Sequence, residues 1–444
     1  MPEYKKPETK QEFDTNFQQI KPLMNETEAY YESSRCLFCY DAPCVKACPT
    51  GIDIPLFIKQ INTGNPLGSA KTIYDSNYFG FACGKVCPTE VLCEGSCVYN
   101  LQNVKPIEIG RLQSYATASA IGKDKIYFQP TENNGKKVAV IGAGPAGISC
   151  ACELRMYGYE VDIFEGKENP SGLTIYGIAP YKITNEEVLS EIDYLQKQFG
   201  FRISYNSRIE SKEDFKKIEK SFNAIFIGIG LGITGRLKIQ GEELQNCIGA
   251  VEFISELRMN HHKTHVGKHV IVLGGGNTAM DAASESARMG AEKVLLAYRR
   301  SKEEMKAYGF EYELAKNAGV ESIFNVSPVE IIGKNITEGV KFARTKIVNG
   351  VFEIIPDSEF VLKCDMVIKA TGQTKHKEVL LNIDHLEFDK KGNLAVNPST
   401  FQTSNPHYFS AGDIISGGQE VVNAVADAKK AAKGIHKFLS GQSV

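Results

Sequence analysis

The sequence lacks any apolar run long enough to cross a lipid bilayer, so it predicts no membrane-spanning helix. Its first residues, MPEYKKPETK, lack the apolar core of a signal peptide. It also lacks an excess of one charge, because 51 Lys and Arg residues stand against 53 Asp and Glu residues, for a formal net charge of -2. Such a chain has no electrostatic reason to bind nucleic acid or an anionic membrane. We therefore expect a cytoplasmic protein that binds neither.

Cysteine, in contrast, is abundant and unevenly placed. The 444 residues are enough for two to four domains and contain 12 cysteines, with eight of them between Cys36 and Cys97. Disulfides are rare in a reducing cytosol, so this cysteine block indicates a metal site or a redox cluster.

The spacing of the cysteines favours iron–sulfur clusters. Zinc sites usually present two tight cysteine pairs a dozen or more residues apart, whereas here four thiols form one run and two cysteines precede proline. In bacterial ferredoxins the cysteine before proline binds the other cluster of a pair. We predict two [4Fe–4S] clusters that exchange ligands between two segments, with structural zinc as the alternative. The segments are Cys36-x2-Cys39-x4-Cys44-x3-Cys48-Pro49 and Cys83-x3-Cys87-Pro88-x4-Cys93-x3-Cys97.

After a polar linker, the sequence changes character at Lys137. The stretch KVAVIGAGPAG reads as a strand and a glycine-rich turn, followed by a helix and the strand EVDIF. The same order recurs in HVIVLGGGNTAMDAASESARMGAEKVLLAYRR. Two such βαβ units predict two dinucleotide-binding domains.

The first unit has the features of an FAD site. Gly142, Gly144 and Gly147 form the G-x-G-x-x-G pattern, which lets a pyrophosphate approach the backbone at a helix N-terminus. Glu165 ends the next strand, where a carboxylate can bind a ribose diol. The distal segment FSAGDI places Asp413 where it can bond the ribityl chain of FAD, although such a residue is more often a loop cap.

The second unit carries G-x-G-x-x-A, from Gly274 to Ala279, but its second strand ends in AYRR instead of an acid. Arg299 and Arg300, with Lys306 as a third cation, could bind a 2′-phosphate, so NADPH is favoured and NADH stays open. A solvated basic turn is the alternative. CDMVIKATG, residues 364–372, reads as a buried strand and a tight turn that could pass a dinucleotide or be an ordinary strand end.

Across nearly its whole length the chain resembles the N-terminal half of dihydropyrimidine dehydrogenase and the separate bacterial subunit that matches that half. It is similar, more loosely, to the small subunit of glutamate synthase. The resemblance runs from SSRCLFCYDAPCVKACPTGIDI through CGKVCPTEVLCEGSC to AGDI, and IEIGRLQ favours the pyrimidine group.

The resemblance implies the cluster ligands. One cluster would use Cys36, Cys39, Cys44 and Cys97, and the other Cys48, Cys87, Cys93 and Gln113. Cys83 would then be a buried non-ligand, although a count of eight thiols from the sequence alone would make it the eighth ligand. An amide oxygen is a weaker donor than a thiolate and would shift the potential of its cluster.

The resemblance also implies the cofactor-binding residues. For FAD they are Gly142, Ala143, Gly144, Pro145, Ala146, Gly147, Glu165, Gly172, Leu173, Lys182, Ile209, Gly412 and Asp413. For NAD(P)H they are Gly275, Gly276, Asn277, Thr278, Arg299, Arg300, Lys306, Ala370, Thr371 and Gly372. Two departures are Ser171, where the family often has Gly, and GIAPYKIT in place of the usual GIPxFRLP.

We therefore expect an α/β chain with a helical iron–sulfur domain followed by two nested Rossmann-type domains. The expected segments are 1–122 for two [4Fe–4S] clusters, 136–255 and 365–444 for FAD, and 256–364 for NAD(P)H. The resemblance implies an oxidoreductase in which NAD(P)H gives a hydride to the flavin and single electrons leave through the clusters. Because the cofactors carry this chemistry, we name no catalytic side chain.

The terminal reaction needs a partner. In the resembled enzyme an FMN-bearing barrel reduces uracil or thymine to 5,6-dihydropyrimidines, and such a barrel needs about 250 residues that do not remain here. An FMN-bearing partner subunit, or another iron–sulfur acceptor protein, is therefore expected. Two alternatives stay open. One is a glutamate synthase small subunit or a ferredoxin–NADP reductase subunit, and the other is a zinc-stabilised nucleotide sensor without turnover.

Overall fold

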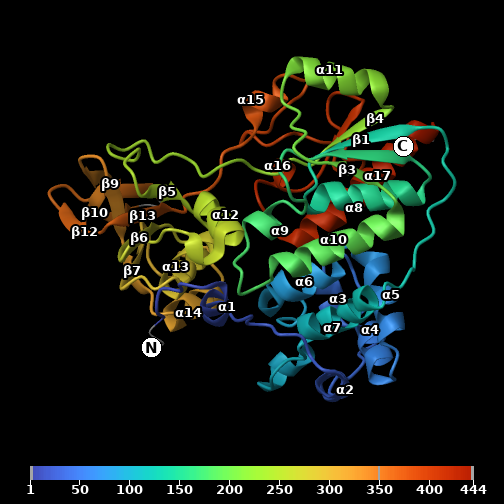
Figure 1. The fold of residues 1–444 in the computed structure, drawn as a ribbon, viewed down its shortest axis with the longest axis horizontal. Coiled ribbons are helices and arrows are strands. Elements are labelled where there is room, and N and C mark those ends of the chain that lie inside the picture. Colours follow the sequence, from blue (N-terminus) through green and yellow to red (C-terminus); the bar gives the residue numbers. More distant parts are fainter. Residues whose placement is uncertain (1–3, 349–350, 442–444) are drawn as a thin grey trace. The chain divides into compact units, whose positions relative to one another are not determined.

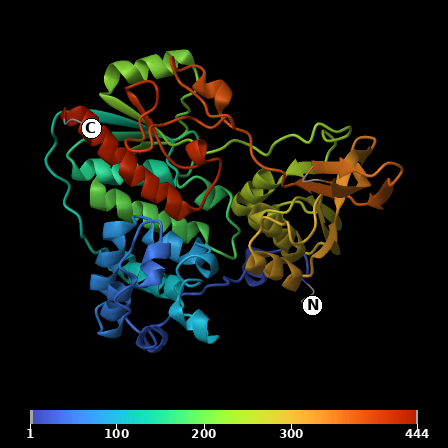
Figure 2. The ribbon, with the colours of Figure 1, turned by 180° about the vertical axis from the view of Figure 1, so that it is seen from behind.

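The computed structural model describes residues 4–348 and 351–441, and Figures 1 and 2 show it from opposite sides. The chain forms two compact units, each assembled from separate stretches of sequence. The first unit comprises residues up to Gln19, Tyr176–Tyr181 and Gly232–Thr374. The second comprises Ile20–Ile175, Lys182–Leu231 and the residues from Lys375 onward.

The second unit begins with a helical part that holds the cysteine block. Several of its helices start at polar caps: Asn25, Asp53 and Asn65 each accept a hydrogen bond from the first turn of the helix that follows. The stretch NPLGSAKTIYDSN forms α5. The elements are α2 Glu26–Ser34, α3 Pro43–Ala47, α4 Ile54–Asn62, α5 Pro66–Ser76, α6 Gly80–Val86, η1 Thr89–Val91, η2 Val98–Gln102 and α7 Ile109–Gly122.

The rest of the second unit surrounds a parallel five-stranded sheet with the order β14-β4-β1-β2-β3. Its central strands are buried along almost their whole length, as expected for a parallel sheet with helices on both sides. Phe215 and Ile218 of α11 pack against Ile225 and Ile227 of β4. The strands are β1 Lys137–Ile141, β2 Glu160–Phe164, β3 Arg202–Ser204, β4 Ala224–Ile227 and β14 Tyr408–Ser410.

The helices of this sheet domain include the two that follow the predicted motifs. Helix α8 leaves the first glycine-rich turn, and the C-terminal α17 packs along it. Helix α10 begins with a capping box formed by Thr184 and Glu187 and ends at Gly200, whose left-handed backbone favours glycine. The bounds are α8 Pro145–Met156, α9 Leu173–Tyr176, α10 Asn185–Phe199, α11 Lys212–Ser221, α15 Lys377–Leu380, α16 Asp413–Ser416 and α17 Val421–Ser440.

The first unit has its own parallel five-stranded sheet, ordered β5-β13-β6-β7-β8, and a smaller antiparallel sheet in which β10 pairs with β9, β11 and β12. The parallel sheet contains β5 Cys247–Gly249, β6 His269–Leu273, β7 Lys293–Tyr298, β8 Glu321–Phe324 and β13 Met366–Lys369. The antiparallel strands are β9 Val326–Gly333, β10 Thr337–Val348, β11 Val351–Ile354 and β12 Phe360–Lys363. The helices are α1 Lys10–Asn16, α12 Ala250–Asn260, η3 His261–Lys263, α13 Asn277–Arg288 and α14 Gly309–Asn317.

The expected α/β fold with parallel sheets is confirmed, and the two repeated βαβ units form β1–α8–β2 and β6–α13–β7. The two compact units differ from the expected sequence segments in their boundaries. Residues up to Gln19 group with the first unit, because Asn16 and Arg288 exchange side-chain-to-carbonyl hydrogen bonds. The second parallel sheet also takes β5 and β13 from outside the expected segment 256–364. Within the described residues, no helix is both long and apolar enough to cross a bilayer.

Candidate functional site

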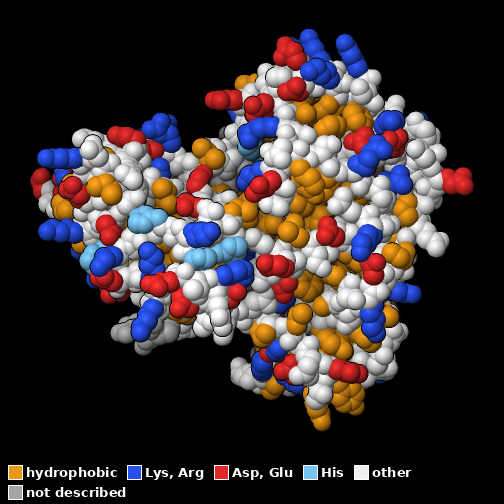
Figure 3. Space-filling model, viewed as in Figure 1, with side chains coloured by type: hydrophobic (Ala, Val, Ile, Leu, Met, Phe, Trp, Pro, Cys, Tyr) orange, Lys and Arg blue, Asp and Glu red, His pale blue; other side chains and the backbone are white. Residues whose placement is uncertain are grey.

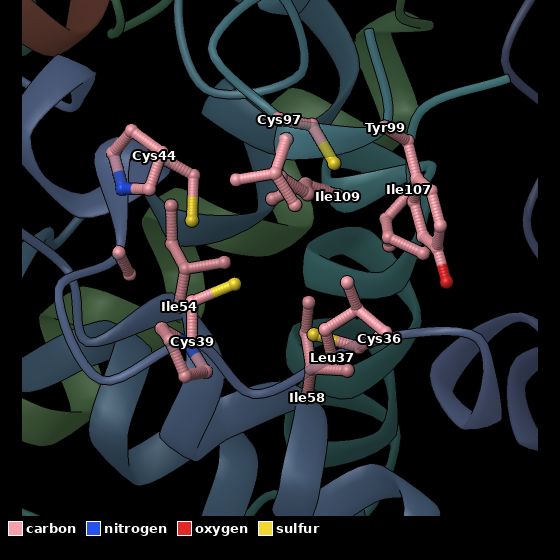
Figure 4. A pocket seen from close by; sticks show the side chains of 14 residues that line it. Cys36, Leu37, Cys39, Cys44, Ile54, Ile58, Cys97, Tyr99, Ile107 and Ile109 are labelled. Carbon is pink, nitrogen blue, oxygen red and sulfur yellow. The ribbon is translucent and has the colours of Figure 1, made fainter. Parts of the chain in front are cut away.

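The structure gathers Cys36, Cys39, Cys44 and Cys97 around one cavity, which we call the first thiol group. Figure 4 shows their sulfur atoms directed toward a common space among Ile54, Ile58 and Ile109. Burial raises the pKa of the Cys44 thiol to about 12, and the nearby charges of Cys36 and Cys97 contribute to that rise. Four thiols that share one apolar cavity are suited to a thiolate-bound cluster, whose iron would favour their deprotonation.

Cys48, Cys87 and Cys93 form a second thiol group. A hydrogen bond with Cys83 and burial raise the pKa of Cys87, and the charges of Cys83, Cys93 and Cys48 raise it further. Burial likewise raises the pKa of Cys93, with Cys48 among the nearby groups. Cys83, on α6, is therefore next to this group and buried.

Gln113 lies on α7, which packs against α6. It is 7% exposed, and its Nε2 donates to the carbonyl oxygen of Gly80 at 2.7 Å. Because the amide nitrogen is used in this bond, Oε1 is the atom of Gln113 that can act as a ligand. Without the family resemblance, a buried glutamine on a helix gives no signal of such a role.

Each thiol group draws cysteines from both sequence segments, since Cys97 joins the first segment and Cys48 joins the second. In the described part of the chain, no three or more His, Cys, Asp or Glu side chains are placed to hold a single metal ion. A four-iron cluster differs from a zinc ion in this respect, because its ligands surround a larger core and lie farther apart. The donor chemistry and its grouping fit iron–sulfur clusters.

The first glycine-rich turn joins β1 to α8 in a conformation that needs glycine. Gly142 has φ of +98°, and a Cβ on Gly147 would lie 1.9 Å from the carbonyl oxygen of Gly142. Glu165, at the end of β2, accepts the backbone N–H of Ala143 at 2.8 Å and that of Lys167 at 2.9 Å. The predicted acid therefore lies against the predicted turn, as a dinucleotide site requires.

Two distant segments approach the same turn. A Cβ on Gly172 would lie 3.2 Å from the Cα of Gly144, and one on Gly412 would lie 3.0 Å from the Cβ of Ala146. Asp413 accepts the backbone N–H of Gln419 at 2.9 Å, and burial raises the pKa of its carboxyl group. The segments expected to bind FAD thus converge on one place in the second unit.

Ser171 marks this place in an unusual way. Its backbone has φ of +78°, its side chain is fully buried, and its N–H donates to the carbonyl oxygen of Ala143 at 2.7 Å. Its hydroxyl has no hydrogen-bond partner within the described chain. A buried polar group without a partner, beside a glycine-rich turn, fits a site that receives a polar dinucleotide.

The other residues expected at the flavin, Leu173, Lys182 and Ile209, lie in different parts of the chain. Leu173 begins α9, one residue after Gly172. Lys182 is 8% exposed and directly follows Tyr176–Tyr181, the segment that groups with the first unit. Ile209 packs with the apolar core beside Ile141 and Phe164, which end β1 and β2.

The second glycine-rich turn joins β6 to α13 in the first unit. A Cβ on Gly274 would lie 2.5 Å from the carbonyl oxygen of Ala370, so the start of the predicted segment Ala370, Thr371 and Gly372 lies against the turn. A Cβ on Gly276 would meet nothing within 4 Å, which leaves open space at the start of α13. The carbonyl oxygen of Gly275 accepts the N–H groups of Lys306 and Ala307 at 3.0 Å.

Of the predicted cations, Lys306 contacts this turn through its backbone, and Arg299 and Arg300 directly follow Tyr298, whose ring lies against Gly275. Arg299 is exposed and its guanidinium lies 5.5 Å from the ring centre of Phe352, while Nε of Arg300 is buried without a hydrogen-bond partner. Among residues 4–348 and 351–441, no ion pair involves Arg299, Arg300 or Lys306. Thr278 follows Asn277 in the first turn of α13, and the Oδ1 of Asn277 accepts the N–H of Tyr308 at 3.0 Å.

Sequence reasoning did not identify the side chains that hold these elements in place. Tyr298 packs against Gly275, where a Cβ would lie 2.5 Å from its ring, and Glu191 bonds the backbone of α6. A tyrosine at the end of a strand and an acid in a helix carry no motif of their own. Only the departure at Ser171 gave a sequence signal.

Comparisons with known proteins agree with this arrangement. The family model for pyridine nucleotide-disulphide oxidoreductases matches residues 136–428. The model for the dihydropyrimidine dehydrogenase domain II, 4Fe-4S cluster, matches residues 13–125.

Full-length relatives cover both parts. The small chain of glutamate synthase [NADPH] from Escherichia coli K12 is 32% identical over 95% of this chain and 94% of its own. The NAD-dependent dihydropyrimidine dehydrogenase subunit PreT of the same organism is 31% identical over 95% of this chain and 97% of its own. The beta subunit of the NADP(+)-dependent formate dehydrogenase of Moorella thermoacetica is 32% identical over 90% of this chain and 60% of its own.

Solved structures show the same fold over 69% of the chain. FprA from Mycobacterium tuberculosis, in complex with NADPH, has a TM-score of 0.58 at 18% identity over 85% of its chain, and T. acidophilum thioredoxin reductase has 0.54 at 20% identity over its full length. The resemblance to dihydropyrimidine dehydrogenase and glutamate synthase subunits is confirmed. The chain therefore belongs to the pyridine nucleotide-disulphide oxidoreductase family, as an NAD(P)H-dependent flavoprotein oxidoreductase with an N-terminal iron–sulfur domain.

Proposed function

We propose that this chain is the electron-input subunit of a dihydropyrimidine dehydrogenase. In this proposal it takes reducing equivalents from NADPH and delivers them to a partner that reduces uracil or thymine. One observation carries the proposal: two thiol groups lie in the same unit as the first glycine-rich turn, and a second such turn lies in a unit of its own. The motif IGRLQ favours the pyrimidine reaction, whereas the identities of 31% to PreT and 32% to the glutamate synthase small chain do not separate the two candidates.

Different residues of the chain would hold FAD and each of the two clusters. FAD, when bound, would exchange a hydride with the nicotinamide and release single electrons, and two [4Fe–4S] clusters would relay them. The turn from Gly142 to Gly147, Glu165 and Asp413 would hold FAD. The first thiol group, and the second thiol group with Gln113, would hold the clusters. The apolar side chains that line the first cavity, and the partial burial of the cysteines in both groups, would limit the access of water to the iron.

NADPH is the proposed donor because Lys306 contacts the second turn, Arg299 and Arg300 follow the tyrosine that packs against it, and all three lack a described ion-pair partner. A 2′-phosphate would supply their counter-charge, and guanidinium groups bind phosphate through two parallel hydrogen bonds. Arg299 is held near this turn by packing on Phe352, and its carbonyl oxygen accepts a hydrogen bond from Thr345 Oγ1 at 2.8 Å. Both contacts limit the motion of Arg299 before the nucleotide arrives.

The proposed outlet lies beside the first thiol group. Leu37, between two of its cysteines, is 56% exposed, and Tyr40 is fully exposed on the same loop. Tyr30 and Tyr31 of α2 are also exposed, and Figure 3 shows hydrophobic side chains gathered on this helical part. Apolar side chains next to a redox group suit the docking of the electron-accepting subunit, because apolar contact excludes water between the two centres.

A second candidate function is the small chain of a glutamate synthase. Its support is specific, since that relative is 32% identical over 95% of this chain. Both candidates share the input chemistry and differ only in the partner and the last acceptor.

The test is to purify the tagged chain with its natural partner and follow two reactions. NADPH-dependent conversion of uracil to dihydrouracil would support the pyrimidine function. NADPH- and glutamine-dependent formation of glutamate would instead support the second candidate. Ferricyanide reduction by the isolated chain serves as the control, because it needs the input module but no partner.

A further inference from the structure

Helix α10 connects the region of the predicted flavin site with the helix that leads to the second thiol group. It begins directly after its N-cap Thr184 and close in sequence to Lys182, one of the residues expected at the flavin. Two of its acids, Glu187 and Glu191, are four residues apart. Residues at this spacing lie on the same side of a helix. Both side chains contact α6, which runs from Gly80 to Val86 and is followed by Cys87.

Glu191 caps α6 from this neighbouring helix. Its side chain is 1% exposed, and its two oxygens accept the N–H groups of Phe81 at 2.7 Å and Ala82 at 3.0 Å. These groups belong to the first turn of α6 and have no partner within that helix. α6 has no side-chain cap of its own, because Phe79 occupies the cap position. The start of the cysteine-bearing helix is therefore fixed by a residue more than a hundred positions away in sequence.

A carbonyl oxygen of the first turn of α6 also has a side-chain partner. The Nε2 of Gln113 donates to the carbonyl oxygen of Gly80 at 2.7 Å, next to the two N–H groups that Glu191 accepts. Any movement of the first turn of α6 would thus disturb Glu191 and Gln113 together. Glu191 acts on the amide of Gln113 through a single turn of backbone.

Glu187 holds the other end of α6. It lies 3.1 Å from the ammonium group of Lys85, whose side chain is fully buried and which also donates to the carbonyl oxygen of Lys21 at 3.0 Å. Lys21 in turn donates to Thr89 Oγ1 at 2.8 Å, and the N–H of Thr89 donates to the carbonyl oxygen of Cys87 at 2.8 Å. A continuous set of contacts therefore runs from Glu187 to the loop of the second thiol group.

We propose that Glu187 and Glu191 are positioning residues that set the place of Cys87 and Gln113, and so the geometry and potential of the second cluster, from the flavin-binding part of the chain. The inference rests on the proposed function, because it presumes a cluster at the second thiol group. A capping serine or asparagine within α6 would satisfy one N–H group at lower desolvation cost. The buried carboxyl group of Glu191 accepts two N–H groups and also connects α6 to α10.

The test uses the full-length chain with the substitutions Glu191→Gln and Glu187→Gln. Glu186→Gln is the control, because Glu186 is an exposed acid on the same helix. Glutamine keeps the size of the side chain, but its NH2 group meets an N–H donor where a carboxyl oxygen accepted one. Hydrogen exchange of the α6 peptide is measured in iron-free protein. Iron, sulfide and FAD per chain and the electron paramagnetic resonance spectrum of the reduced protein are measured after reconstitution.

We expect Glu191→Gln to speed hydrogen exchange at the start of α6 at least tenfold. The same variant should contain half the iron or show a shift in one of two electron paramagnetic resonance signals, while its FAD content stays at the wild-type level. Glu187→Gln should speed exchange in the segment from Lys85 to Cys93, and the control should match wild type. Unchanged exchange and iron in both variants would overturn the proposal. So would joint loss of FAD and iron, which would show a general stabilising contact. Wild-type protein without iron would refute the proposed function, whereas the exchange result would still test the contact.

Discussion

Replacing Ser171 by glycine should stabilise the flavin-free protein. A side chain in the left-handed region costs about 1–2 kcal/mol, and Ser171 has φ of +78°. Its buried hydroxyl without a partner adds a desolvation cost of about 1–3 kcal/mol. Glycine lowers the gain by about 0.5–1 kcal/mol through its freedom in the unfolded chain. The net expectation is a stabilisation of about 2 kcal/mol.

The assay is scanning calorimetry of the flavin-free chain, which needs no tryptophan, a residue that the sequence lacks. For a unit of this size, about 2 kcal/mol raises the melting temperature by roughly 4 °C. The relevant transition is the one that FAD shifts upward, because FAD would bind only that folded unit. Ser171→Ala is the matched control, since it removes the hydroxyl and keeps the backbone strain.

The comparison separates two contributions. The glycine variant should be more stable than the alanine variant by the cost of the left-handed backbone. Both variants should bind FAD about tenfold more weakly if the hydroxyl bonds the cofactor, since one hydrogen bond is worth about 1 kcal/mol or somewhat more. If the glycine variant were no more stable than the alanine variant, the strain argument would be refuted. If both variants bound FAD as tightly as wild type, the hydroxyl would have no role at the cofactor.

Three further results are expected. The double substitution Arg299→Ala and Arg300→Ala is measured with ferricyanide as acceptor. It should raise the KM for NADPH by about 10–100-fold and leave the KM for NADH nearly unchanged, since charged hydrogen bonds contribute about 1.5–3 kcal/mol. Equal changes in both KM values would contradict the phosphate site. Cys83→Ser should retain the wild-type iron content and Gln113→Leu should lose iron, and the reverse outcome would make Cys83 the eighth ligand. Burial raises the pKa of Glu191 to about 8, above the ordinary value of about 4.3, so the folded chain binds the extra proton between these values. The Glu191 contribution to stability should therefore be fully present at low pH and decline by about 1.4 kcal/mol per pH unit as pH rises toward 8. A stability difference between wild type and Glu191→Gln that did not vary with pH would show that Glu191 does not titrate there.

Local patterns were sufficient to predict the nucleotide-binding units. The turns at Gly142 and Gly274 have positions where a Cβ would collide with backbone or side chain, so their glycines recur at fixed spacing and can be recognised in sequence. The runs KVAVI and HVIVL are buried along nearly all of their length, and continuous apolar stretches of that kind predict parallel strands.

Long-range contacts could not be predicted in the same way. Helical spacing places Glu191 on the same face as Val188 and Leu195, but its task there could not be predicted, because the N–H groups that it accepts belong to α6. The residues before Gln19 join the first unit through Asn16 and Arg288, two positions with no shared motif. The antiparallel strands β9 and β10 were also missed, because their burial does not alternate regularly and their pairing contains register shifts.

The interrupted path of the second unit has a consequence for biosynthesis. Its sheet starts with β1 but gains its edge strand β14 only from Tyr408–Ser410, and α8 is covered by α17 from Val421 onward. The first unit, in contrast, has all of its strands once Lys369 has been synthesised. On the ribosome, the unit whose glycine-rich turn emerges first is therefore the last to be completed. Loss of the final helix would expose α8, the earliest-made helix of the proposed flavin site, far upstream of the missing residues.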